Sequence, residues 1–386
     1  MSFVRKTKGA TSSSSSSSAP GPQSRGTRVC PTGGPPIIST GCADLDRVIG
    51  GGLPLGTLSV FAEDGWTHHA ALFLKYFVSE AVAAGQSVGV VRHEHQQCAD
   101  AGDFLLRRMS KSDAVKEEEA EQAEIAAARD ATKLRIAWQY EKYAKSARGR
   151  GPETGAHPGR LALGKGGASP GSKGPWCHDH DIRKAPSAED VRRMLEAPGG
   201  EGGEHVFQET WTIRSGGGAV AQIVEAVRAF SAQICKRPGE VGRLVIPSLG
   251  DATWDMEADA VVNALSVIRS IAQQDPQIAV AVSVPLRVMR PSDAKRIMYV
   301  SDACFSLAAV EDTSSLAVLS ADAKTVSGAM EIVRLPKFGS VRSSLPDVRS
   351  YVVRNRRRRL ALEVFDVDPD AEAGGADGDA PLTTDW

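Results

Sequence analysis

The 386-residue sequence lacks several features that would assign it to a broad class at once. It has no apolar run near the roughly 18 residues of a membrane helix, and no apolar signal core at its N-terminus. Its six cysteines form no C-x-x-C pair, which argues against a disulfide framework and predicts a reducing compartment. The net charge is only −1, so affinity for a polyanion would need a local patch. We therefore expect a protein of the cytoplasm and nucleus with no membrane partner.

Three segments are poor in periodic apolar residues. Residues 1–35 contain a serine run, and residues 366–386 are acidic and rich in Gly and Ala, so both are predicted to be disordered tails. The acidic tail could solubilise the protein or bind a partner. Residues 108–203 are predicted to be a largely low-complexity insert that includes a charged run, a strand at Thr132–Tyr143 and a short helix in PSAEDVRRMLEAP. The rest of 36–365 suffices for one large domain.

That remainder alternates segments of helical and strand period, which predicts an α/β domain. A short helix stopped by Gly50–Gly52 leads into a buried strand, Thr57–Phe61, and an amphipathic helix, Ala70–Ala84. The almost continuously apolar run Ile278–Leu286 predicts a strand covered on both faces. The late strands, from Asp302 to Arg334, are expected to extend the sheet antiparallel. The other predicted elements are strands at Ser87–Val91, Leu244–Ile246, Asp302–Val310, Ser315–Leu319, Gly328–Arg334 and Tyr351–Phe365 and helices at Gly218–Arg237 and Glu257–Gln274.

The string STGCADLDRVIGGGLPLGT before the first strand resembles the segment that precedes the phosphate loop in RecA-like ATPases. In active members of that class the strand is followed by G-x-x-x-x-G-K-[ST], whose amides, lysine and hydroxyl hold phosphates and magnesium. Here both framing glycines, the lysine and the hydroxyl are replaced, and two acidic residues stand where a polyphosphate would lie. The loop is therefore predicted to be a degenerate phosphate loop. Its eight positions are Ala62, Glu63, Asp64, Gly65, Trp66, Thr67, His68 and His69.

The second nucleotide motif is also predicted to be degenerate. In a RecA-like ATPase the strand at Leu244–Ile246 would end in an aspartate that helps to hold magnesium. Pro247 stands at that place, and Asp251 further on is expected to cap a turn. We therefore predict no catalytic residue and no cofactor for this chain alone, with the role of ATP in a larger assembly left open.

A locally basic loop is expected after the strand Ile278–Leu286. In RecA-like rings this loop faces the central pore and touches nucleic acid, so its basic residues are candidates for polyanion binding. A basic solvent-exposed turn is an equally open interpretation. The candidate residues are Arg287, Arg290, Lys295 and Arg296.

A second basic run, RNRRRRLALEV, has two interpretations as well. It could face RNA or direct nuclear import, or it could be one face of an edge strand whose Leu360, Leu362 and Val364 pack inward. We favour the edge strand.

The histidine and cysteine residues of RHEHQQC and WCHDHD suit zinc as ligand types, but their spacing matches no zinc site. We favour surface loops and predict no metal. These residues are His93, His95, Cys98, Cys177, His178 and His180.

Together, STG-x-x-x-LD-x-x-x-GGGLPLGT, LRIAWQY, LVIPSLGDATW, EIVRLPKF and RRRRLALEVF resemble the Elongator complex protein 4 (PAXNEB) family. The resemblance implies a RecA-like (P-loop NTPase-type) fold, with a twisted, mostly parallel sheet and helices on both faces. It implies a non-catalytic subunit of the accessory ring in which Elongator subunits four, five and six alternate as a heterohexamer. That ring binds tRNA and docks on the catalytic part of Elongator, which modifies the wobble uridine of tRNA anticodons.

Two other functions stay open. The chain could be an active RecA-type ATPase subunit that contributes to ATP-dependent tRNA release, if a residue from a neighbour completed the site. It could also be a regulatory adaptor that binds protein partners through its tails and insert.

Overall fold

The computed structural model describes residues 24–30, 33–96, 101–110, 176–196, 208–214, 218–237, 239–310, 326–336 and 348–364, with isolated positions in 112–123 and at 346. Its centre is a nine-stranded sheet in the order β14-β13-β12-β11-β4-β10-β9-β5-β8. The strands from β11 to β8 in that order are parallel, whereas β12, β13 and β14 are antiparallel. The strands are β4 (Leu58–Ala62), β5 (Ser87–His93), β8 (Gln208–Ile213), β9 (Gly242–Ile246), β10 (Ile278–Val284), β11 (Ala303–Ala308), β12 (Val326–Arg334), β13 (Ser350–Asn355) and β14 (Leu360–Val364).

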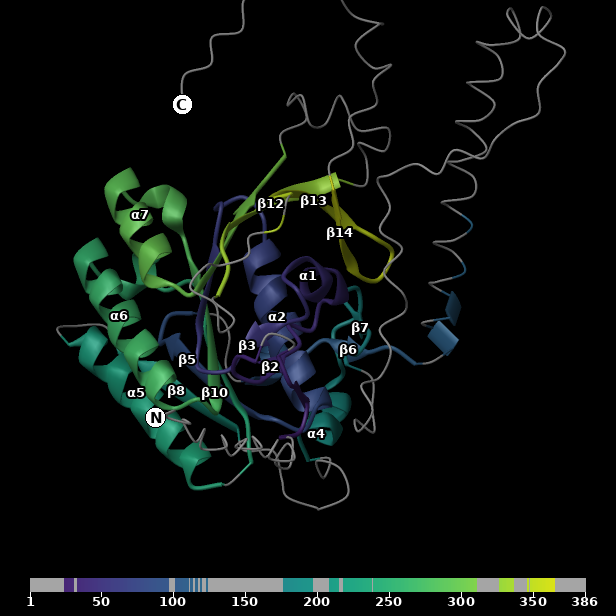
Figure 1. Ribbon diagram of the computed structural model, residues 1–386, viewed down its shortest axis with the longest axis horizontal. Coiled ribbons are helices and arrows are strands. Elements are labelled where there is room, and N and C mark those ends of the chain that lie inside the picture. Colours follow the sequence, from purple (N-terminus) through teal and green to yellow (C-terminus); the bar gives the residue numbers. More distant parts are fainter. Residues whose placement is uncertain are drawn as a thin grey trace, which may run out of the picture.

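Helices cover both faces of this sheet (Figure 1). One group packs on one face in a core that includes Phe230, Leu265 and Ile297. The other group packs on the opposite face, where Phe61 stacks between Phe73 and Phe305 with ring centroids 5.6 and 5.1 Å away. The first group is α5 (Ala219–Cys235), α6 (Ala258–Gln274) and α7 (Pro291–Val300), and the second is α1 (Ala43–Val48), α2 (His69–Ala83) and α4 (Ala188–Glu196).

The architecture is α/β with a large mixed sheet, and it is compatible with the predicted RecA-like fold. The chain leaves β4 through α2 and enters β5, which is not a neighbour of β4. It then returns through β9 and β10, which fill the gap between them, and reaches β11 on the far side of β4. The loop after β4 leads to α2 on one face of the sheet, whereas the loop after β10 leads to α7 on the other face. Ligands of open α/β sheets bind at such a reversal, outside the carboxyl ends of the strands.

The structure corrects the boundary of the predicted N-terminal tail. Residues 24–30 fall within the predicted 1–35 tail, yet β1 (Thr27–Arg28) pairs with β2 (Ile37–Ile38), and β3 (Leu53–Pro54) completes a small sheet. Cys30 is buried as well. Residues 1–23 and 366–386 lie outside the described residues.

The structure describes the start of the predicted insert and a later part of it, residues 176–196. Strand β6 (Arg107–Arg108) pairs with β7 (His180–Asp181), so the chain comes back beside residues 107–108 before it forms α4. Helix α4 confirms the predicted short helix. The predicted strand Thr132–Tyr143 and most of the charged run lie outside the described residues.

The elements of the central domain follow the sequence predictions, with three corrections and with one strand, β8, that was not predicted. Strand β11 is parallel to its neighbour β4, so the antiparallel extension begins only at β12. The predicted single strand Tyr351–Phe365 is a hairpin of β13 and β14, in which Val364 is exposed rather than inward. The predicted basic loop is a short 3-10 helix, η3 (Leu286–Val288), followed by α7. The predicted strand Ser315–Leu319 lies outside the described residues.

In the described part of the chain, no helix has the length and apolar content needed to cross a bilayer. Among the described residues, Cys42, Cys177, Cys235 and Cys304 are free thiols.

Candidate functional site at the carboxyl edge of the sheet

The loop after β4 is held by its own carboxylate. The Asp64 side chain accepts hydrogen bonds from the backbone amides of Trp66 (3.1 Å) and Thr67 (2.9 Å) and from the Thr67 hydroxyl (3.1 Å). Asp64 is 3% exposed, and Gly65 takes the turn with a φ of +79°. These are backbone donors directly before a helix, the arrangement that binds phosphate in nucleotide-binding loops. Here they are bonded to a side chain of the same loop.

The other acidic residue of the loop joins it to the loop after β9. The Ser248 hydroxyl donates to a Glu63 carboxylate oxygen at 2.8 Å. Pro247, at the predicted aspartate position, is the first residue after β9, and its carbonyl accepts from the Gln96 amide at 2.9 Å. The segments that follow β4, β9 and β5 are thus bonded to one another at the carboxyl edge.

The two histidines that end the loop differ in environment. His69, at the predicted hydroxyl position, is buried, and its Nε2 lies 3.0 Å from the carbonyl oxygen of Ser327 in β12. His68, at the predicted lysine position, is exposed. Because no Lys or Arg occurs in Ala62–His69, His68 is the one exposed side chain of this loop that could become cationic.

The four basic candidates are all exposed, on η3, α7 and the turn between them. Arg296 forms ion pairs with Asp259 and Asp293, and Arg290 lies 3.7 Å from Asp293. Among the described residues, Arg287 and Lys295 have no ion-pair partner. Exposed ion pairs contribute little and are screened by salt, so all four side chains are available to a polyanion.

Three exposed apolar side chains belong to the same edge or to α7. Trp66 lies in the predicted degenerate phosphate loop, whereas Val288 and Tyr299 were not singled out from the sequence. Trp66 is 81% exposed, Val288 is 77% exposed and Tyr299 is 75% exposed. Ala62 of β4 and Val284 of β10 are register partners, so the residues after them leave the sheet side by side. The signal that could have marked Tyr299 is an aromatic residue three and four positions after Arg296 and Lys295 in the same helix.

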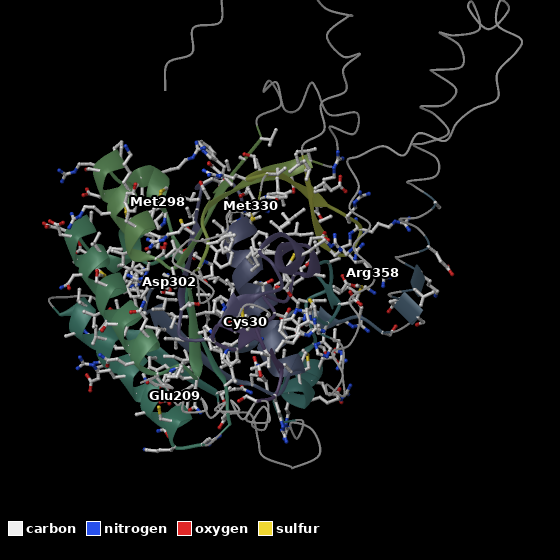
Figure 2. The ribbon with its side chains drawn as sticks, in the orientation of Figure 1. Cys30, Glu209, Met298, Asp302, Met330 and Arg358 are labelled. Carbon is white, nitrogen blue, oxygen red and sulfur yellow. The ribbon has the colours of Figure 1, made fainter. Side chains whose placement is uncertain are left out.

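The second basic run is mostly used within the fold, as the edge-strand interpretation expected. Arg354 and Arg356 both pair with Glu363 across the hairpin. Arg358 approaches Asp181 of β7 at 3.9 Å, and the Arg358 carbonyl accepts the amide of Ile182. Figure 2 shows Arg358 on the flank of the molecule where the hairpin meets the returning insert. Among the arginines of the run, Arg357 alone is exposed, whereas the others are partly buried.

The histidines considered for a metal are mostly not on surface loops, which corrects that interpretation. Buried Glu80 of α2 accepts the amide of His178 (2.9 Å) and lies against His178 Nδ1 (2.9 Å) and His180 Nε2 (3.3 Å). His93 is buried with its ring 5.4 Å from that of Trp254, whereas His95 is exposed. No group of three or more metal-ligating side chains was found among the described residues, and Cys98 lies outside them.

These histidines belong to a buried polar cluster, defined here as Asp46, Glu80, His178, His180 and Arg243. Arg243 is fully buried and donates to the Gln86 side chain and to two backbone carbonyls. Burial lowers the pKa of Arg243 to about 10. Burial raises the pKa of Asp46 to about 7, and its hydrogen bonds from Ser39 and Thr40 oppose that shift. The cluster joins the segment before α1, α2, β9 and the end of the insert.

The chain is similar to known proteins over most of its length. A family model described as PAXNEB protein matches residues 20–381. Elongator complex protein 4 of Dictyostelium discoideum is 21% identical over 364 residues, which cover 88% of this chain and 76% of that protein. The protein of the same name from Xenopus laevis is 22% identical over 363 residues, covering 89% and 83%. The Drosophila melanogaster one is 38% identical over 119 residues, covering 30% and 26%.

Proposed function

The chain belongs to the PAXNEB family, and we propose that it acts as a non-catalytic RecA-like subunit of the Elongator accessory ring. In this proposal it alternates with Elongator subunits five and six in a heterohexamer, binds tRNA and supports wobble-uridine modification. The chemistry of that modification is carried by the catalytic Elongator subcomplex. The proposal places the protein in the cytoplasm and nucleus.

The observation that carries the non-catalytic part is the Asp64 carboxylate on the amides of Trp66 and Thr67. A phosphate would have to displace this carboxylate and would meet Glu63 beside it. A like-charge contact of that kind costs several kcal/mol when it is dry. The loop also has no lysine or arginine to offset the charge. Nucleotide binding here is therefore expected to be weak.

The tRNA-binding part is supported by the exposed cations of η3 and α7. Arg287 and Lys295 extend from the carboxyl edge without partners among the described residues, and Tyr299 supplies an exposed ring on the same helix as Lys295. Cations supply the salt-dependent part of nucleic-acid affinity, and exposed rings stack on unpaired bases.

The first test measures tRNA binding across a salt series, with the protein alone and mixed with Elongator subunits five and six. We expect tight, salt-dependent binding only in the mixture. In the triple variant Arg287→Ala, Arg290→Ala, Lys295→Ala the slope of log affinity against log salt should fall by about 2 to 3, because each phosphate contact contributes roughly 0.7 to 0.9.

A matched control removes the same charge elsewhere. Arg183, Arg228 and Lys236 are exposed and lie off the carboxyl edge, so their triple alanine variant should keep the wild-type slope. Equal losses in both triple variants would mean that binding depends on net charge alone. Undiminished binding in the first variant would refute the assignment to η3 and α7.

The alternative function, an active RecA-type ATPase subunit that contributes to ATP-dependent tRNA release, predicts a different result. It needs a cation near the phosphates, and within Ala62–His69 only exposed His68 could supply one. ATP turnover by the isolated chain, abolished by His68→Ala and not by the control triple variant, would establish it. No turnover alone and unchanged turnover of the mixture in His68→Ala would favour the non-catalytic subunit.

A further inference from the structure

A basic and apolar surface extends over η3 and α7 and is called here the α7 surface. Its apolar members Val288 and Tyr299 are largely exposed and belong to the same two elements as the cations. The side chain of Arg334 in β12 donates to the Tyr299 carbonyl, which adds a cation beside the end of α7. The residues of the surface are Arg287, Val288, Arg290, Lys295, Arg296, Tyr299 and Arg334.

Positive charge exceeds negative charge on this surface. Its cations face two carboxylates, those of Asp259 and Asp293, and both carboxylates pair with Arg296. Arg287 and Lys295 are unpaired among the described residues. The surface therefore suits an acidic ligand with an apolar anchor.

The chain itself contains such a ligand. Residues 366–386 have no Lys, Arg or His, and they end in a tryptophan, Trp386. Their acidic residues are Asp366, Asp368, Asp370, Glu372, Asp377, Asp379 and Asp385.

The point where this segment leaves the fold is set by the strand register. Strand β14 ends at Val364. When its paired residues are followed from strand to strand across the sheet, Val364 lies level with the residue just after Ala62, at the carboxyl edge. Five strand spacings separate β14 from β10 in the sheet order, or about 24 Å. Residues 366–386 could reach about 70 Å when extended. The partners are Val364 with Tyr351, Tyr351 with Met330, Met330 with Leu307, and the preceding Ser306 with Ala62.

We infer that the acidic segment 366–386 binds the α7 surface of its own chain, with its carboxylates on Arg287 and Lys295 and Trp386 against Val288 or Tyr299. A tethered segment binds at a high effective concentration, so weak individual contacts suffice. One consequence depends on the proposed function, namely that the segment competes with tRNA for the same cations. The contact itself does not depend on that function.

The contact is tested on the full chain with a carbodiimide that couples an amine directly to a carboxylate. Lys295 is the reporter on the α7 surface, and exposed Lys184 and Lys236 are controls away from it. We expect Lys295 to couple to carboxylates of 366–386 several-fold more than either control does. The coupling should decline between 0.1 and 1 M salt, over which the screening length falls from about 10 to about 3 Å.

Variants of the segment test whether coupling depends on its negative charge and not only on its being tethered nearby. Asp377→Asn, Asp379→Asn and Asp385→Asn together should lower coupling at the remaining carboxylates, whereas Thr383→Ala with Thr384→Ala should not. Uniform coupling of all three lysines, or none at Lys295, would overturn the inference. Mixing isotopically heavy and light protein identifies coupling between two copies, which would also overturn it.

A tRNA titration keeps this inference separate from the proposed function. If both hold, the Asp→Asn variant binds tRNA several-fold more tightly than the full chain in the presence of subunits five and six. If Lys295 couples to the segment but no tRNA binds, the contact stands and the proposed function fails. If tRNA binds with the same affinity in the variant and Lys295 does not couple, the contact is absent and the function stands.

Discussion

Replacing Glu80 tests whether the buried polar cluster fastens the end of the insert to α2. In Glu80→Gln the side chain keeps its shape but loses its charge and presents an amide N–H to donors of His178. Removing the acceptor of a buried hydrogen bond leaves its donor unsatisfied and costs about 1 to 3 kcal/mol, and more where the group is charged. The expected loss at neutral pH is therefore on the order of 3 kcal/mol in the free energy of unfolding.

The pKa of Glu80 gives an independent estimate of the same quantity. Its burial acts to raise the pKa, but the hydrogen bonds from His178 and His180 prevail and lower it to about 2 from 4.5. A depressed carboxylate pKa corresponds to about 1.4 kcal/mol per unit, or on the order of 3 kcal/mol here. This stability is present above pH 4.5 and is lost as the pH falls toward 2.

The assay is urea unfolding followed by far-ultraviolet circular dichroism at pH 7 and at pH 3. Glu80→Gln should be much less stable than the wild type at pH 7, and the difference should shrink at pH 3. Glu225→Gln, an exposed carboxylate on α5, controls for removing one negative charge. A loss below about 1 kcal/mol at pH 7, or a difference that stays constant with pH, would refute the reasoning, since a buried charged acceptor that is removed from its donors should cost more.

Three further predictions use other parts of the chain. Burial raises the pKa of Asp46 to about 7 from 3.8, so its contribution to stability is present below pH 3.8 and is lost as the pH rises through 7. In Asp46→Asn the thermal midpoint should no longer fall with pH over this range. An unchanged pH dependence would contradict the assignment. Asp64→Ala should free the amides of Trp66 and Thr67, so phosphate should raise the thermal midpoint of the variant and not of the wild type, and stabilisation of both would contradict this. Gly41→Ala should cost about 2 kcal/mol or more in urea unfolding, because a Cβ would lie 2.3 Å from the Tyr76 carbonyl oxygen at a φ of +84°, and a neutral effect would mean that the turn relaxes.

The central elements were predictable because their apolar residues report burial locally. Residues 278–284 are apolar apart from Ser283 because both faces of β10 are covered, and the helices α5 and α6 have one apolar face each. The partners of His178 and His180 were not predictable, because Glu80 lies about a hundred residues away and its charge alone gives no reason to bury it. Val364 was assigned inward from strand alternation, but it ends the edge strand, where burial is incomplete.

At the candidate site the sequence predicts a degenerate phosphate loop, and the structure adds the contacts that hold this loop. Substitution of the lysine and the framing glycines could have left a collapsed loop with no fixed shape. Instead Asp64 holds the amides and Glu63 bonds Ser248, so the loop keeps a defined form without an external anion. Anions that the protein itself supplies repel a second anion at the same place. A polyanion is therefore expected to bind outward from this loop, at Arg287 of η3 and Lys295 of α7, which have no ion-pair partner in the described part of the chain. The Asp64→Ala and Lys295→Ala variants should accordingly affect different ligands, phosphate for the first and tRNA for the second.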